Sequence, residues 1–170
     1  MVREILTFEN PVLREKAKKV ARVDASIQRL LDDLTETMLN APGAGLAANQ
    51  IGVALRVCVV KGDDKQIWGL VNPEIVKKAG VQVGPEGCLS YPGWVGEVER
   101  AETVVVKGRN RHGKEIRVKS TGFTARAFQH EIDHLEGVLF TDRLTSLDTL
   151  RRVEELADEE KEEAIAAASG

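Results

Sequence analysis

Two histidines four positions apart, in the segment Gln129-His130-Glu131-Ile132-Asp133-His134, are the feature that most constrains this 170-residue chain. The spacing of apolar residues predicts a helix from about residue 123 to residue 135. On a helix both imidazoles project from one face, one turn apart, and can bind the same metal ion. Glu131 lies at the rim of this face, where it can reach a metal-bound water without being a ligand. Apolar side chains on the other faces predict that the helix is buried.

The third metal ligand must come from another part of the chain, because a catalytic metal site usually has three protein ligands and one position for water. The longer pattern with a third histidine is excluded, since Phe140 occupies the position of that histidine. Glu154 or Glu155 on a later helix would complete a zinc peptidase. Cys88 is the other candidate, and its thiolate suits zinc, ferrous iron, cobalt or nickel. The helix alone leaves both alternatives open.

The composition restricts the class of protein. With 42% hydrophobic and 30% charged residues, the chain is typical of a soluble globular protein, and it contains no apolar run of membrane-spanning length. A net charge of −3 gives no general attraction to nucleic acid, so we expect neither a nucleic-acid substrate nor a membrane partner. The N-terminus lacks the apolar core of a signal peptide, which predicts a cytoplasmic protein. The length fits one domain, residues 1–170.

Local patterns predict the remaining elements. Asn10-Pro11 predicts a short helix to about Lys18, and residues 26–39 predict a second helix with one apolar stripe. Residues 146–170 predict a C-terminal helix to about Ala168 with an acidic outer face. Between these helices, short β-branched runs separated by turn residues predict antiparallel strands. The predicted strands are Leu55–Lys61, Ile67–Asn72, Val81–Val83, Trp94–Val98, Thr103–Lys107 and Glu115–Lys119.

Two further segments carry residues that could complete a site. Residues 43–50, Gly-Ala-Gly-Leu-Ala-Ala-Asn-Gln, form a run of small side chains that ends in polar residues. The run lacks the closing Gly-Lys-Ser/Thr of a phosphate-binding loop, so nucleotide binding is improbable. Residues 86–90, Glu-Gly-Cys-Leu-Ser, are interpreted as a loop between strands in which Cys88 is open to the approach of another element.

The three segments together resemble the peptide deformylases, in which G-x-G-x-A-A-x-Q, E-G-C-x-S and H-E-x-x-H occur in this order. They stand here at residues 43–50, 86–90 and 130–134, and the resemblance covers most of residues 1–145. It implies an α+β fold in which antiparallel β-sheets wrap around a central metal-binding helix, with N-terminal helices and a C-terminal helix. The implied reaction removes the formyl group from N-formylmethionine of newly made polypeptides and releases formate.

The resemblance also implies a role for each matching residue. One divalent metal ion per chain, Fe²⁺ in the cell with Zn²⁺, Ni²⁺ or Co²⁺ as alternatives, would be held by Cys88, His130 and His134. Glu131 would move the proton from the attacking water to the departing amine. The oxyanion that forms from the formyl oxygen would be bound by the Gln50 side-chain amide and the Leu89 backbone N–H.

The substrate would be an N-formylmethionyl peptide lying close to the chain as an added strand. The residues expected to contact it are Gly43, Ala44, Gly45, Glu86, Gly87, Phe123, Arg126 and Ala127. The last three lie on the His130 face of the helix and are expected to line the pocket for the methionine side chain. Glu86 has two candidate roles: to orient a ligating histidine, or to form an ion pair with Arg100. A transient association with the ribosome is the other interaction considered, but the acidic C-terminal helix disfavours docking through that helix.

Overall fold

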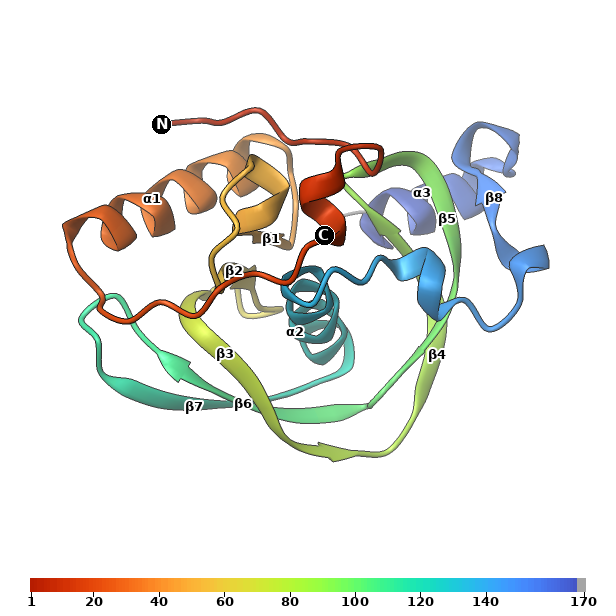
Figure 1. Cartoon of the computed structure of the whole chain (residues 1–170). Coiled ribbons are helices and arrows are strands. Elements are labelled where there is room, and N and C mark those ends of the chain that lie inside the picture. Colours follow the sequence, from red (N-terminus) through yellow and green to blue (C-terminus); the bar gives the residue numbers. More distant parts are fainter. Residues whose placement is uncertain (168–170) are drawn as a thin grey trace.

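Two antiparallel sheets curve around one helix in the computed structural model, which describes residues 1–167 (Figure 1). The first sheet has the strand order β1-β2-β3-β6-β7, and the second has the order β4-β5-β8. The enclosed helix is α2, Gly122–Leu135, and most of its side chains are buried. The structure therefore confirms the predicted α+β class with antiparallel sheets around a central helix. No helix within residues 1–167 has the length and apolar character needed to cross a membrane.

The bounds of the elements are as follows. The α-helices are α1 (Ala25–Asn40), α2 (Gly122–Leu135) and α3 (Asp158–Ala167). The strands are β1 (Gly45–Ala47), β2 (Val57–Lys61), β3 (Ile67–Ala79), β4 (Gln82–Cys88), β5 (Tyr91–Arg100), β6 (Thr103–Arg109), β7 (Glu115–Thr121) and β8 (Arg151–Arg152). Short 3-10 helices span Pro11–Arg14, Ala48–Ile51, Phe140–Arg143, Leu147–Thr149 and Val153–Glu155.

Each of the two N-terminal helices begins directly after a residue whose side chain caps it. Asp24 accepts a hydrogen bond from the Ile27 backbone N–H and starts α1, whose apolar stripe is buried as the sequence predicts. Asn10 caps the 3-10 helix in the same way, but this helix ends at Arg14 and does not continue to Lys18. The prediction failed there because the backbone N–H of Lys18 donates to the Ala54 carbonyl, so the segment pairs with another part of the chain.

The strand predictions are confirmed in position, but β4 and β5 extend beyond their predicted bounds, and so does β3. It continues through Asn72 and Pro73, where the register with β6 shifts between Val71 and Glu74. Such a bulge accommodates both the proline and the positive φ of Asn72. The Asn72 side chain bonds both the backbone N–H and the carbonyl of Val20 and so stabilises the irregular backbone.

The C-terminal helix was predicted to begin at residue 146, and this boundary was wrong. The helix α3 begins at Asp158, and Leu147, near the start of the predicted helix, is 76% exposed in a 3-10 turn. Residues 151–152 instead pair with β5 as β8, and the Ser146 hydroxyl accepts from the Asp148 backbone N–H in a 3-10 turn. Pairing with the open edge of β5 competes with helix formation for the same backbone groups. Residues 168–170 of the predicted helix lie outside the described residues.

Candidate metal centre and active site

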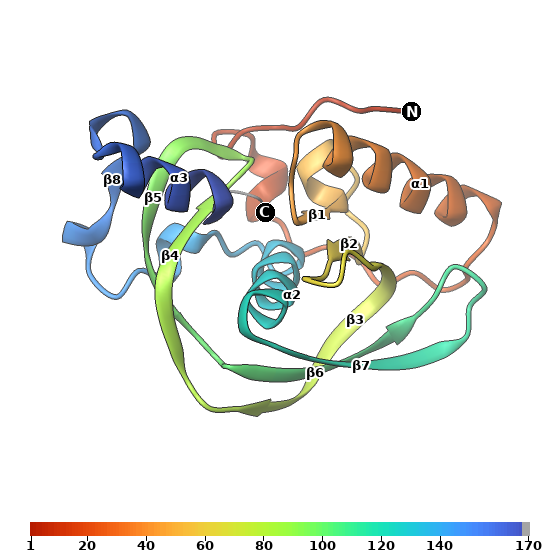
Figure 2. The same cartoon turned by 180° about the vertical axis from the view of Figure 1, so that it is seen from behind.

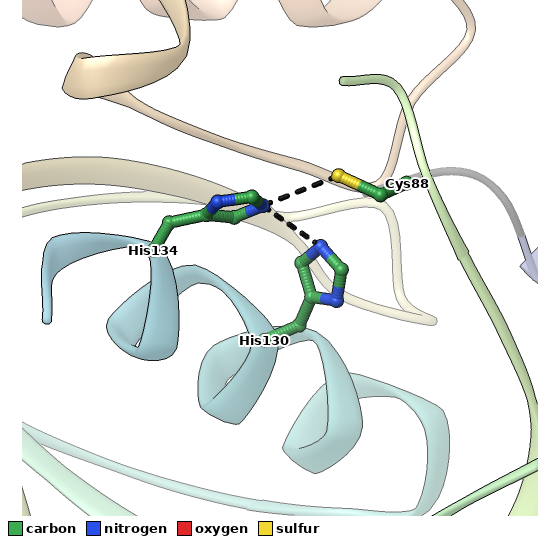
Figure 3. Close-up of side chains that lie close together, drawn as sticks. All are labelled: Cys88, His130 and His134. Atoms are coloured by element: carbon green, nitrogen blue, oxygen red, sulfur yellow. Dashed lines mark hydrogen bonds between the residues drawn. The ribbon is translucent and has the colours of Figure 1, made fainter. Parts of the chain in front are cut away.

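The histidine face of α2 meets the end of β4 in the interior of the protein. The Nε2 atoms of His130 and His134 are 3.0 Å apart, and His134 Nε2 lies 3.3 Å from Cys88 Sγ (Figure 3). One ligand atom from each of the three residues lies within 4.8 Å of the other two, and all three residues are buried. Two imidazole nitrogens and one thiolate are a donor set that suits zinc, iron, nickel or cobalt. The three predicted ligands are thus brought together.

Cys88 reaches this position from a strand end. The sequence suggested a loop, whereas the structure makes Cys88 the last residue of β4. The register between β4 and β5 shifts at Gly87 and Cys88, so the strand bends there and its last side chain turns away from the regular sheet pattern. The Ser90 backbone N–H donates a hydrogen bond to Cys88 Sγ at 3.4 Å.

Glu86 contacts the partners of both roles considered for it, His130 and Arg100. Its Oε1 lies 2.6 Å from His130 Nδ1, and Arg100 donates to both of its carboxyl oxygens, at 2.6 and 3.1 Å. Burial opposes the charge, yet the hydrogen bonds from His130 and Arg100 hold the pKa of Glu86 well below its usual value. A carboxylate that accepts from Nδ1–H leaves Nε2 of the same ring free to bind a metal.

Arg126 is the second arginine, after Arg100, that forms an ion pair with Glu86. It was predicted to line the substrate pocket; it lines a pocket that also contains His130, and its guanidinium is turned toward Glu86 Oε2 at 2.7 Å and the Val98 carbonyl at 3.2 Å. Sequence analysis missed this partner because the two residues are 40 positions apart. The network continues from Arg100 to Asp133 at 2.5 Å, and Asp133 binds the exposed Arg143 at 3.1 Å.

Glu131 is fully buried, and neither of its carboxyl oxygens has a hydrogen-bond partner among the described residues. Burial raises its pKa to about 8. A divalent cation beside it would lower this pKa again, because a nearby positive charge favours the carboxylate. An unpaired buried carboxylate is costly in a structural position and is therefore typical of a group kept for chemistry.

Gly45 provides the space that Glu131 occupies. A Cβ atom at this position would overlap the Glu131 carboxyl oxygen and lie 2.9 Å from its Cδ and Cγ. Gly45 belongs to β1, a three-residue strand that the sequence analysis did not predict because its small residues carry no β-branched signal. Besides any contact with substrate, this glycine therefore sets the position of the carboxylate.

We expect Gly45→Ala to lower kcat by about 10²-fold, because a displacement of about 1 Å in a reacting group can have that effect. The measurement is steady-state formate release together with a thermal unfolding curve. Gly84→Ala is the matched control, since a Cβ there would lie 3.5 Å from Arg126 Nη2, an ordinary contact. A folded Gly45→Ala protein with the kcat of the parent would refute the steric role.

Gln50 and Leu89 flank the cysteine. The Gln50 side chain is buried, and its Oε1 accepts from the Ala47 backbone N–H at 2.9 Å. Its Nε2 donates to Ser90 Oγ at 3.0 Å and lies 3.8 Å from Cys88 Sγ, so the donor end of the amide faces the ligand cluster. Leu89 follows Cys88 directly, and its partly buried side chain packs against a hydrophobic cluster.

A pocket opens beside His130. It is lined by Ala44, Glu86, Gly87, Phe123, Arg126, Ala127, His130 and Ala167. Six of the eight residues predicted to contact substrate are in this set, while Gly45 abuts Glu131 and Gly43 lines a neighbouring outer hollow. Sequence analysis missed Ala167, because nothing in the local pattern indicates that the C-terminal helix returns to the site.

The alternative ligands Glu154 and Glu155 do not join the cluster. Both side chains are exposed, and Glu154 lies near Arg152 at 3.4 Å. Among residues 1–167, the group of histidine, cysteine and acidic side chains placed to hold a metal contains Cys88 as its third member. The zinc-peptidase arrangement therefore receives no support.

A buried Cys-His-His ligand set with an unpaired carboxylate beside it defines a metal-dependent hydrolase. The polypeptide deformylase family model matches residues 2–150. The chain is 53% identical over 153 residues to the peptide deformylase of Dehalococcoides mccartyi strain CBDB1, an alignment that covers 89% of this chain and 92% of the relative.

Solved structures agree with this match. The peptide deformylase of Legionella pneumophila superimposes with a TM-score of 0.79 at 41% identity, covering 98% of this chain and 93% of that one. The enzyme of Thermotoga maritima gives a TM-score of 0.82 at 38% identity, covering 86% and 99%. The chain belongs to the polypeptide deformylase family. Its reaction is the hydrolysis that removes the N-formyl group from N-formylmethionine of newly made polypeptides.

Proposed function

We propose that Cys88, His130 and His134 hold one divalent metal ion per chain, and that this ion is Fe²⁺ in the cell. The observation that supports the ligand set is the burial and mutual proximity of these three side chains. When bound, the ion would supply Lewis acidity, which lowers the pKa of a water molecule beside it toward about 7. Zn²⁺, Ni²⁺ and Co²⁺ suit the same donors, so availability in the cell decides among them.

Glu131 is the general base and acid of the proposed mechanism. It accepts a proton as the water oxygen attacks the formyl carbon, and it returns this proton to the nitrogen as the C–N bond breaks. Formate and a free amino group are the products. Its buried carboxyl group, with no hydrogen-bond partner among residues 1–167, supports this assignment because both oxygens remain available for the proton.

The oxyanion that develops on the formyl oxygen is stabilised by two donors, the Gln50 side-chain amide and the Leu89 backbone N–H. The bonds from Ala47 N–H to Gln50 Oε1 and from Gln50 Nε2 to Ser90 support the proposal, since they fix the amide orientation before substrate arrives. A preorganised donor of this type contributes about 2.7–4 kcal/mol to transition-state stabilisation. Glu86 and Arg126 act one step away, by holding the His130 ring.

The peptide backbone is proposed to lie along Gly43, Ala44 and Gly45 on one side and Glu86 and Gly87 on the other. β1 and β4 are edge strands of their two sheets, which supports this arrangement because an edge strand can pair with an extended peptide. The methionine side chain then enters the pocket beside His130. Its proposed lining side chains are Phe123, Arg126 and Ala127.

The cellular setting follows from the substrate. We propose a single catalytic domain over residues 1–170 that acts in the cytoplasm, where new polypeptides emerge. Any association with the ribosome is transient and does not use α3, because three acidic residues begin this helix and ribosomal RNA is itself a polyanion.

Anaerobic purification followed by metal analysis and a formate-release assay tests the identity of the ion. We expect iron in equimolar amount with the chain, and release of formate from a formyl-methionyl peptide. A chelator should remove both the iron and the activity, and added Fe²⁺ should restore them. Equimolar zinc with full activity in the anaerobic preparation would refute iron as the native ion and leave the proposed ligands standing.

A further inference from the structure

The last turn of α3 lies at the mouth of the pocket beside His130. Ala167 lines this pocket together with Phe123 and Ala127, which come from α2. Ile165 and Ala166 line the adjoining outer hollow, which also contains Gly43 and Phe123. Figure 2 shows α3 lying across β4. The C-terminal helix thus meets the very surface proposed to receive substrate.

The pocket is too small for a methionine side chain while α3 is in this position. The space that a water-sized sphere can enter is about 10 Å³, which accommodates about one water molecule. The outer hollow measures about 380 Å³. Phe123 and Ala44 line both spaces, and the last residues of α3 contribute to both linings.

Buried ion pairs join the α2 and β4 walls of the pocket, whereas α3 rests on β4 and most of its residues are exposed. Glu86, Arg126 and His130 belong to the buried ion network around the ligands. In α3 the one fully buried side chain is Ala164, which packs on Val95 and Leu156. The ion pair between Arg151 and Glu160, at 3.3 Å, is about half exposed and contributes little.

We propose that α3 is a cover over the side-chain pocket, and that a substrate with a long first side chain must displace it in order to bind. This inference rests on the proposed assignment of the pocket to the methionine side chain. A cover that is closed for most of the time lowers the affinity, because the apparent Kd equals the Kd of the open form divided by the fraction of open molecules. It therefore raises KM without changing kcat, because α3 supplies neither a proposed metal ligand nor the proposed proton carrier.

A protein truncated after Ala157 tests the cover. We expect KM for a formyl-methionyl peptide to fall about three- to tenfold, with kcat unchanged, since binding no longer requires displacement of α3. The effect on a formyl-alanyl peptide should be much smaller, because its side chain does not reach into the pocket. An unchanged or increased KM for the formyl-methionyl peptide would overturn the proposal.

A full-length variant keeps the test independent of the truncation. Ala164→Lys places a charge in the contact with Val95 and should release α3, so we expect the same decrease in KM. Glu163→Gln is the matched control, because Glu163 is exposed on the same helix and should leave KM unchanged. If Ala164→Lys keeps the KM of the parent, the cover is refuted even if the truncated chain does not fold.

Ala127→Leu separates failure of the cover from failure of the pocket assignment. If Ala127→Leu raises KM for formyl-methionyl peptide while truncation changes nothing, the pocket is correctly assigned and the cover is wrong. If Ala127→Leu also leaves KM unchanged, the methionine side chain of the substrate binds elsewhere. Both the pocket assignment and the proposed cover are then wrong.

Discussion

Replacing Glu131 with glutamine lowers kcat for formate release by about 10²–10⁴-fold, the usual contribution of a positioned acid–base group. Glutamine keeps the volume of the side chain but cannot accept the proton of the attacking water. The original carboxyl group is fully buried and has no hydrogen-bond partner among residues 1–167, so the substitution breaks no described hydrogen bond. The loss should appear in kcat rather than in KM. Steady-state kinetics of formate release measure both constants.

Metal content and thermal stability are the controls for this variant. We expect both to remain at the level of the parent, because Glu131 is not one of the three clustered ligands. The neutral side chain also removes the cost of burying a charge, so unfolding should occur at the same or a higher temperature. A Glu131→Gln protein that retains its metal and the kcat of the parent would exclude Glu131 as the proton carrier.

Replacing Cys88 with alanine removes the metal and with it the activity. Loss of a residue that only orients a ligand commonly weakens metal affinity by about 10–100-fold, so loss of a ligand should cost at least as much. The site cannot replace the sulfur, since the described group of candidate ligands contains just His130 and His134 besides Cys88. Metal analysis after dialysis, together with formate release, gives the result.

Glu154→Ala and Glu155→Ala are matched controls, because these residues are the third ligand in the zinc-peptidase alternative. Both side chains are exposed, and we expect both variants to keep metal and activity. The opposite pattern, in which Cys88→Ala retains metal and either glutamate variant loses it, would contradict the Cys-His-His centre.

The parts of the fold that the sequence predicts well are those with local causes. The apolar stripe and the Asp24 cap specify α1, and β-branched runs specify most of the strands. β1 was missed because its three small residues are held by pairing with β2, which is not visible in the local sequence. The start of α3 was placed too early for a related reason, since β5 captures residues 151–152 as a partner strand.

The candidate site likewise contains residues that the sequence reveals and partners that only the folded structure reveals. His130, Glu131 and His134 are recognisable because one helix turn contains all three, and Cys88 and Gln50 follow from the resemblance of their segments to a family pattern. The partners that orient them depend on contacts between distant positions. Arg126 and Arg100 meet on Glu86 across 40 and 14 residues, and Ala167 approaches Ala127 only through the docking of α3.

The candidate metal centre is complete only when the network around Glu86 has formed, because its members come from distant parts of the chain. The helix α2 can present its two histidines by local interactions alone, but Glu86 and Cys88 arrive with β4, and Arg100 arrives with β5. Contacts between residues so far apart in the sequence require a loss of loop-closure entropy before they stabilise the fold. A partly folded chain thus has a helix with two histidines but no oriented ligand set. The three candidate ligands are accordingly held together and oriented only in the fully docked protein.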